Sequence, residues 1–219
     1  MTARSAATQT YVAFLRAINV GGRAVVSMAD LQEAFRSAGC QAVRSYIQSG
    51  NVVFEARPDQ AGALFKRISR EVARLFDRCP TIVFRTADHL QQLVSSDPFK
   101  SARRESTAKF YVTFLEGAPA IEPAFPLAHS KEAIEAIGID ALDVFIVSRP
   151  KRKGFYGFPN EVIEKALGVQ ATSRNWSTVA KIVEFAARPV SSGGARRSTP
   201  PAPRQTTRRG STRTRTPKA

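Results

Sequence analysis

The sequence predicts an α+β protein made of two related α/β halves, with antiparallel or mixed sheets and helices packed on them. Two observations lead to this class. Apolar runs of strand length alternate with segments in which apolar residues recur every three or four positions, as in amphipathic helices. Over residues 10–85 the expected order is strand, helix, strand, strand, helix, strand, which is the ferredoxin-like βαββαβ order.

The first half begins with an almost continuous apolar run at residues 10–18, which is typical of a central strand buried on both faces. Ser27 is placed to cap the next helix, and Gly39 is placed to end it. The remaining elements follow from β-prone runs, a turn and helical periodicity: strands at 42–47 and 51–56, a helix at 59–78, and a strand at 81–84.

The second half is expected to echo this layout without an internal sequence repeat. Helices are predicted at 86–95, 131–137, 160–167 and 175–187, and strands at 110–115, 144–147 and 154–158. The expected domains are therefore a ferredoxin-like half at 10–85, a second α+β half at 86–187, and a tail at 188–219.

Charge is unevenly distributed along the 219 residues. Of the formal net charge of +15, +9 belongs to residues 188–219, which contain nine Lys or Arg and no acidic residue, and this leaves +6 for residues 1–187. No large apolar residue follows Val190, so the tail is predicted to be disordered. No apolar run approaches the ~20 residues that cross a bilayer, and the first ten residues lack an apolar signal segment. A cytoplasmic protein without a membrane partner is expected.

A candidate anion-binding loop connects the first strand to the first helix. Asn19, Gly21 and Gly22 permit backbone conformations that point several N–H groups at one anion. Arg16 and Arg23 add fork-shaped donors suited to phosphate or carboxylate. The loop matches no established nucleotide-binding motif. Two interpretations are open: an anion-binding loop, or a glycine turn with solvated arginines.

Two further polar motifs contain candidate ligand-binding residues. Gln48, Ser49 and Asn51 form a turn between strands, which is either ordinary hairpin chemistry or a source of ligand-binding amides. We expect this turn and the Gly21–Gly22 loop at opposite ends of the sheet. The second motif lies at the start of the 175–187 helix, where a helix N-terminus and nearby donors can hold an anion. Its candidate residues are Arg174, Asn175, Thr178 and Lys181, and the alternative is a solvated helix face.

Three stretches together, LRAINVGG, SYIQSGNVVF and ATSRNWSTVAKI, resemble the family catalogued as domain of unknown function 1697, found mostly in bacteria. The resemblance covers residues 10–187. It implies an α+β fold of two related halves and no stated chemistry. The family pattern usually has glycine at position 17 and lysine at position 23, where this chain has Ala17 and Arg23.

A basic turn in the second half predicts contacts with nucleic acid. Its cations are Arg149, Lys151, Arg152 and Lys153, and they precede two aromatic residues able to stack on bases, Tyr156 and Phe158. The alternative is that these aromatic side chains belong to the core.

Three functions are compatible with these patterns. The first is anion binding in association with nucleic acid, through a basic folded surface and the Arg-rich tail. The second is an enzyme or sensor for a small phosphorylated or carboxylated ligand, and the third is a module that binds an acidic protein. Neither a metal nor a cofactor is expected, and no catalytic residue is identified, because His89 and His129 stand apart from any nucleophile or carboxylate pattern. Oligomeric state is left open.

Overall fold

Two antiparallel sheets with helices packed against them make up the described part of the chain. The computed structural model describes residues 7–16, 26–76, 79–152 and 154–189, and contacts group residues 1–189 into one unit. This arrangement confirms the α+β class.

The first sheet contains four strands in the order β2-β3-β1-β4, and every neighbouring pair is antiparallel. Its elements follow the predicted order: β1 (Gln9–Leu15), α1 (Met28–Ser37), β2 (Gln41–Tyr46), β3 (Asn51–Ala56), the short 3₁₀ helix η1 (Pro58–Gln60), α2 (Ala61–Ala73) and β4 (Ile82–Thr86). Ser27 caps α1, since its hydroxyl accepts from the backbone N–H of Asp30 at 3.0 Å. The likeness to a ferredoxin-like fold remains an interpretation of this order.

Both faces of β1 are buried, which explains its continuous apolar sequence. Tyr11, Ala13 and Leu15 pack with α1 and α2 on one side of the sheet. The alternate side chains of Val12 and Phe14 point to the other side, into a second core. A strand with water on one face would instead alternate polar and apolar residues.

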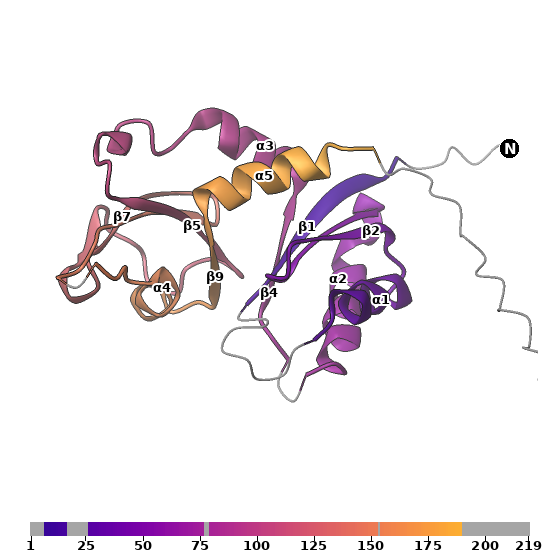
Figure 1. Ribbon diagram of the computed structural model, residues 1–219. Helices are drawn as coiled ribbons and strands as arrows, with labels where there is room; N and C mark the ends of the chain where they lie inside the picture. The colour runs from indigo at the N-terminus through magenta and orange to yellow at the C-terminus, as the bar shows by residue number, and fades with distance from the viewer. Residues whose placement is uncertain (1–6, 17–25, 77–78, 153, 190–219) are drawn as a thin grey trace, which may run out of the picture. The chain divides into compact units, whose positions relative to one another are not determined.

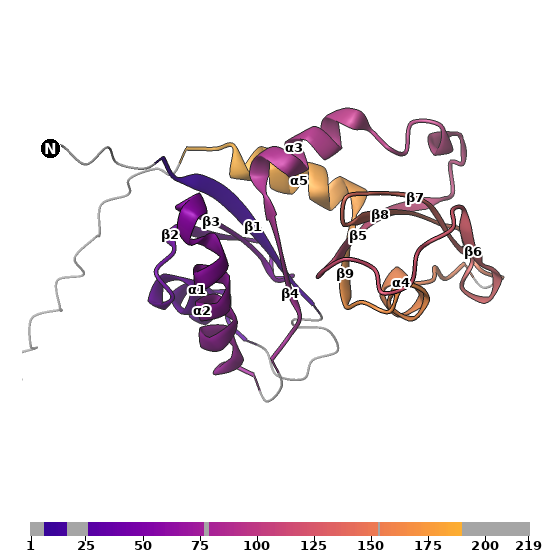
Figure 2. The ribbon, with the colours of Figure 1, turned by 180° about the vertical axis from the view of Figure 1, so that it is seen from behind.

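The second sheet contains five strands in the order β6-β7-β8-β5-β9, again antiparallel between neighbours. The elements of this half are α3 (Ala87–Ser96), η2 (Ala102–Arg104), β5 (Lys109–Leu115), β6 (Leu127–His129), η3 (Ser130–Glu132), β7 (Ile134–Asp140), β8 (Asp143–Ser148), α4 (Pro159–Leu167), β9 (Ala171–Asn175) and α5 (Trp176–Ala186). Helix α4 packs on one face of this sheet (Figures 1 and 2).

Three predictions for this half are wrong. Residues 131–137 form η3 and the start of β7 rather than a helix, because Ile134 and Ala136 alternate with more exposed residues and pair with β8. Residues 154–158 form no strand beyond one bridge, between Pro150 and Tyr156. Within this segment, Gly157 lies so close to the backbone of Glu132 that an added Cβ would be 2.2 Å from the Glu132 carbonyl oxygen.

The third error concerns β9, which the sequence analysis did not predict. Its sequence, ATSRN, is short and polar, and it lies directly before a helix, where Thr and Ser resemble capping residues. The strand is buried instead at Ala171, Thr172 and Ser173, and the Ser173 hydroxyl lies 2.7 Å from that of Thr113 on β5. Arg174 is therefore a strand residue and not part of a helix N-terminus.

A shared core joins the two sheets. Phe14 of β1 stacks on Phe114 of β5 with ring centroids 4.2 Å apart and an interplanar angle of 8°. Both side chains are fully buried, and apolar residues of α3 and α5 close the same core, including Leu90 and Ile182. Figure 1 shows α3 and α5 running side by side along the two sheets.

Removing one ring of this stack should destabilise the protein strongly. We expect Phe114→Ala to lower the free energy of unfolding by about 3–5 kcal/mol, because it leaves a cavity in a closed core. Urea unfolding followed by circular dichroism measures the change. Phe155→Ala is the matched control, since that side chain is 71% exposed; equal losses in the two variants would contradict a core joined through this stack.

Candidate functional site

Arg174 brings the three polar motifs of the sequence together. From β9 its Nε donates to Oδ1 of Asn51 at 2.6 Å, and its Nη2 donates to the carbonyl oxygens of Leu15 at 2.8 Å and Ser49 at 3.1 Å. Its Nη1 donates to Oγ1 of Thr172 at 2.9 Å. The guanidinium also lies over the ring of Phe14, 5.5 Å from the centroid. One side chain thus connects the end of β1, the β2–β3 turn and β9.

The environment of Arg174 identifies this connection as structural. Burial lowers the pKa of Arg174 to about 10, and the hydrogen-bond acceptors around it are carbonyl, hydroxyl and amide oxygens rather than carboxylates. A guanidinium whose three nitrogens all donate within the protein has little capacity left for a ligand. Arg174 therefore holds the surroundings of the candidate site in place.

The prediction that the β2–β3 turn and the β1–α1 loop lie at opposite ends of the sheet is wrong. Strands β1 and β3 are antiparallel with Phe14 opposite Asn51, so the end of β1 meets the start of β3. The backbone N–H of Leu15 donates to the carbonyl oxygen of Gly50 at 2.8 Å. The chain therefore leaves β1 and enters β3 at the same end of the sheet.

Arg16, the first residue after β1, lies beside a pocket. Its backbone N–H donates to the carbonyl oxygen of Thr81 at 2.9 Å, which fixes where the chain leaves the sheet. Its Nη1 pairs with Oε1 of Glu164 at 2.8 Å and donates to Oε1 of Gln170 at 3.1 Å. Glu164 also accepts from the backbone N–H of Ala171, so the ion pair joins Arg16 to α4 and to the start of β9.

The pocket beside Arg16 has a volume of about 760 Å³. It is lined by Arg16, His129, Lys131, Glu132, Phe158, Asn160, Glu161, Val162 and Lys165. Three permanent cations and one histidine thus face two carboxylates. One of these carboxylates, Glu132, is already paired with Lys151 outside the lining.

The first turn of α4 forms part of the pocket wall. Phe158 is the N-cap of α4, and no side chain caps the helix by a hydrogen bond. Pro159 follows at the first helical position, where a missing N–H is tolerated. A helix start carries partial positive charge and orphan N–H groups, which adds to the charge of Lys131 and Lys165. This combination suits an anion with an apolar part that can contact Phe158.

The other predicted ligand residues are spread over several environments. Within the turn, Asn51 is buried and donates to Oγ of Ser49 at 2.7 Å, whereas Gln48 is exposed. Asn175 caps α5 by accepting from the backbone N–H of Ser177 at 3.0 Å. Thr178 and Lys181 lie on α5, away from the pocket lining. The predictions at Asn19, Gly21, Gly22, Arg23 and Lys153 fall outside the described residues.

The basic turn is less available to nucleic acid than its sequence indicates. Arg149 pairs with Glu105 at 2.6 Å and with Glu135 at 2.7 Å, and these hydrogen bonds raise its pKa. Lys151 pairs with Glu132. Arg152 is exposed. Phe155 and Phe158 are exposed as well, by 71% and 57%.

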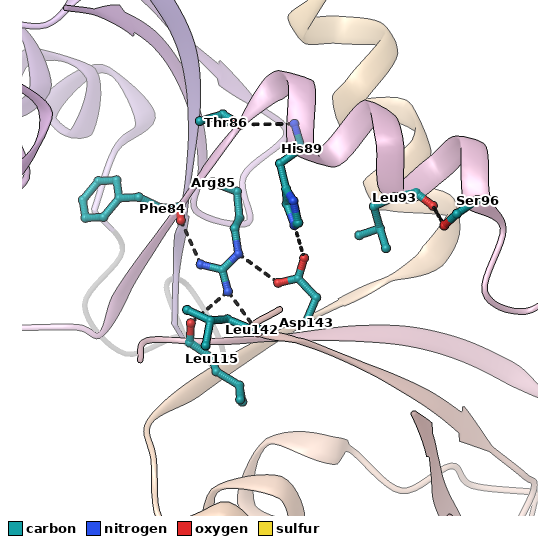
Figure 3. A network of polar contacts seen from close by, with 9 residues as sticks. All are labelled: Phe84, Arg85, Thr86, His89, Leu93, Ser96, Leu115, Leu142 and Asp143. Carbon is teal, nitrogen blue, oxygen red and sulfur yellow. Dashed lines mark hydrogen bonds and ion pairs between the residues drawn. The ribbon is translucent and has the colours of Figure 1, made fainter. Parts of the chain in front are cut away.

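A buried polar network that the sequence did not predict surrounds Asp143 (Figure 3). Asp143 begins β8 and has no exposed surface. Its Oδ1 accepts from Nε of Arg85 at 2.8 Å, and its Oδ2 lies 2.6 Å from Nε2 of His89. Thr86 caps α3 by accepting from the backbone N–H of His89, which fixes the start of that helix. The partners of Asp143 are 58 and 54 residues away in sequence, so no local motif predicts these contacts.

This network raises the pKa of His89 above its usual value. The hydrogen bond to Asp143 is the main cause, and burial opposes it. The charges of Asp143 and Asp140 also favour the imidazolium, whereas Arg85 disfavours it. The arrangement therefore holds a proton on His89 to a higher pH than on a free histidine.

The described ranges contain neither a metal-ion cluster nor a membrane-spanning helix. There, no group of three or more His, Cys, Asp or Glu residues is placed to hold a metal ion. No helix within those ranges has both the length and the apolar character needed to cross a bilayer.

Comparison with known proteins places this chain in a family. A family model described as "Protein of unknown function (DUF1697)" matches residues 8–145. The chain belongs to this family. This confirms the resemblance carried by LRAINVGG and SYIQSGNVVF, whereas ATSRNWSTVAKI lies beyond the matched residues.

A solved structure from this comparison supports the fold alone. "The structure of conserved bacterial protein SP0830 from Streptococcus pneumoniae" has a TM-score of 0.58 and 20% sequence identity to this chain. The match covers 83% of this chain and 100% of that chain. No curated protein matches.

Replacing Arg174 should destabilise the protein. We expect Arg174→Ala to lower the free energy of unfolding by about 2–4 kcal/mol, because several buried acceptors lose their donor at once. Arg174→Lys should recover only part of this loss, since an ammonium cannot replace the guanidinium fork. Urea unfolding is the measurement, with Lys181→Ala as the control; an unchanged midpoint for Arg174→Ala would contradict the structural role.

The His89–Asp143 pair should make stability depend on pH. Because folding raises the pKa of His89, the stabilisation is complete below the value of about 6.5 for an unfolded histidine. It is lost as pH rises through the raised folded pKa. The stability difference between the wild type and His89→Gln should therefore shrink as pH increases over about 5.5 to 8.5. Urea unfolding at each pH measures this difference, and His129→Gln is the control; a constant difference for His89→Gln would contradict the pair.

Proposed function

We propose that the protein binds a small phosphorylated ligand in the pocket beside Arg16. The observation that carries the proposal is the convergence on one cavity of three features: Arg16, which is the second residue of the motif LRAINVGG, two lysines, and the start of α4, which no side chain caps. Within the described residues, neither Lys131 nor Lys165 takes part in an ion pair. A phosphate group can neutralise both lysines and accept from the first N–H groups of α4.

The composition of the pocket also indicates what accompanies the phosphate. Phe158 lines the cavity and is 57% exposed, so its ring is available to a planar or apolar part of the ligand. The volume of about 760 Å³ falls within the ~300–1,000 Å³ typical of small-molecule sites. A nucleotide-sized molecule meets both requirements.

Arg16 is assigned a double role in this proposal. Its ion pair with Glu164 positions the guanidinium at the pocket, and its backbone N–H bonds to Thr81 at the end of β1. The predicted anion-binding residues Asn19, Gly21, Gly22 and Arg23 come directly after it in sequence. They remain predicted anion-binding residues.

Association with single-stranded nucleic acid is the second candidate function. Exposed Phe155 and Phe158 follow exposed Arg152 along the chain, and aromatic rings beside cations are the usual means of holding unpaired bases. The nine cations of residues 188–219 would add affinity without sequence preference. Binding of an acidic protein partner stays a prediction from charge.

Removing one pocket lysine should weaken binding of a phosphorylated probe. We expect Lys165→Ala to raise the Kd for adenosine monophosphate about fivefold, an effect of about 1 kcal/mol. Isothermal titration calorimetry on the full chain measures it, so that the tail is common to all variants. The matched control is Lys66→Ala, an exposed lysine of α2 that does not line the pocket.

The same titrations separate the two candidate functions. Adenosine should bind more weakly than its monophosphate if the phosphate is recognised in the pocket. Equal effects of Lys165→Ala and Lys66→Ala would mean that only overall charge matters, and the pocket assignment would fail. A labelled single-stranded oligonucleotide that binds well when the monophosphate does not would favour the second candidate.

A further inference from the structure

A second, more apolar pocket lies next to the buried Asp143 network. Its volume is about 330 Å³, and it is lined by Tyr11, Phe65, Phe84, Arg85, Thr86, His89, Ala141 and Leu142. These residues come from β1, α2, β4, the start of α3 and the β7–β8 turn. None of them lines the pocket beside Arg16, so the two cavities are separate sites.

Three aromatic rings form one wall of this pocket. Phe65 stacks on Phe84 with centroids 4.1 Å apart and an interplanar angle of 1°. Tyr11 meets the edge of Phe65 at 5.4 Å. The volume lies at the lower end of the range of about 300–1,000 Å³ for small-molecule sites, so a single substituted ring is a suitable size. Aromatic walls favour a ligand with a ring of its own.

The polar groups of the lining are engaged within the protein, with one exception. Arg85 donates through Nε to Asp143, through Nη1 to the carbonyl oxygen of Phe84 at 2.8 Å, and through Nη2 to those of Leu115 at 2.9 Å and Leu142 at 3.0 Å. The hydroxyl of Tyr11 donates to Gln9, and that of Thr86 accepts from the backbone of His89.

His89 is the exception. Its Nε2 faces Asp143, as Figure 3 shows, whereas its Nδ1 has no hydrogen-bond partner among the residues the structure describes. The side chain of His89 is 29% exposed. When the ring is protonated, Nδ1 carries a hydrogen that needs an acceptor.

The charges around the ring determine what that acceptor can be. Asp143 of β8 carries one negative charge, which the positive charge of Arg85 on β4 already balances. A protonated His89 therefore leaves the network with a net positive charge beside an apolar cavity. Asp140, at the end of β7, acts on His89 through its charge but forms no hydrogen bond with it. An anionic acceptor entering from the pocket would complete the charge balance.

We propose that this pocket is a binding site for a small aromatic carboxylate. The ring of the ligand packs against Phe65, Phe84 and Tyr11. One carboxylate oxygen accepts the hydrogen on Nδ1 of His89, while Asp143 holds Nε2 and fixes the orientation of the imidazole. The proposal is independent of the phosphate site, because it uses different residues and a different chemistry.

The test is a titration of the full chain with benzoate, monitored by two-dimensional NMR at pH 6. Benzamide has the same ring without the charge, and acetate has the charge without the ring. We expect benzoate to bind on the order of tenfold more tightly than either, because only benzoate supplies both a ring for the aromatic wall and an anionic acceptor for His89. The benzoate preference should decline as pH rises through the raised pKa of His89. Benzamide binding as tightly as benzoate would overturn the proposal.

Two histidine variants test whether the preference for benzoate depends on His89. His89→Gln should reduce benzoate affinity on the order of tenfold and leave benzamide affinity unchanged, because the lost contact is to the carboxylate. His129→Gln is the matched control, since His129 lines the other pocket, and it should bind benzoate like the wild type. Equal benzoate affinity in His89→Gln and the wild type would overturn the assignment.

A measurement on the wild type covers the case in which His89→Gln does not fold. The ring signals of His89 and His129 can be followed against pH with and without saturating benzoate. Benzoate should raise the pKa of His89 and leave that of His129 unchanged, because a bound anion stabilises the nearby imidazolium. An unchanged pKa of His89 in the presence of bound benzoate would contradict the contact.

Discussion

The hydrogen bonds of Arg174 are the interaction on which the rest of the arrangement depends. One guanidinium from β9 binds the last carbonyl of β1, the carbonyl of Ser49 and the side chain of Asn51. A strand of the second sheet therefore fixes the geometry where β1 ends and β3 begins in the first sheet. The pocket beside Arg16 starts from this end of the first sheet, since Arg16 is the next residue along the chain. A long side chain that is held by neutral oxygens on several sides fixes the positions of its neighbours.

A second link crosses between the halves at Asp143. There the partners are a carboxylate and two cations rather than one cation and neutral oxygens, and the charges do not cancel when His89 is protonated. The two links therefore have different consequences. The contacts of Arg174 define a fixed geometry, whereas the network around Asp143 retains an ionisable group at the surface of a cavity.

Local patterns in the sequence were sufficient for most of the fold. Neighbouring residues are enough to predict the apolar run of β1, the Ser27 cap of α1 and the periodicity of α2. Strand β9 was not, because ATSRN has the composition of a helix cap and becomes a strand only by pairing with β5. In such cases, pairing with a strand that is distant in sequence outweighs the local secondary-structure propensity.

The candidate sites were less predictable for the same physical reason. The motifs point to Arg16 and Arg174 as polar contacts, but no residue near Arg174 in sequence shows that Leu15 and Asn51 accept hydrogen bonds from it. His89 looked isolated because Asp143 is 54 residues away. The second pocket was therefore not predictable from motifs, since its chemistry exists only after the β7–β8 turn meets α3.

The core between the sheets has a consequence for how the chain acquires its structure. One face of the first sheet is buried in the core that joins the two sheets, and the residues that cover it come from later in the chain. The side chains on this face are Val12, Phe14, Val53 and Val83. A fragment containing only the first sheet would expose this apolar face to water. Such a fragment would tend strongly to self-associate. The two halves can be distinguished by their sheets, yet each leaves part of its apolar surface uncovered without the other.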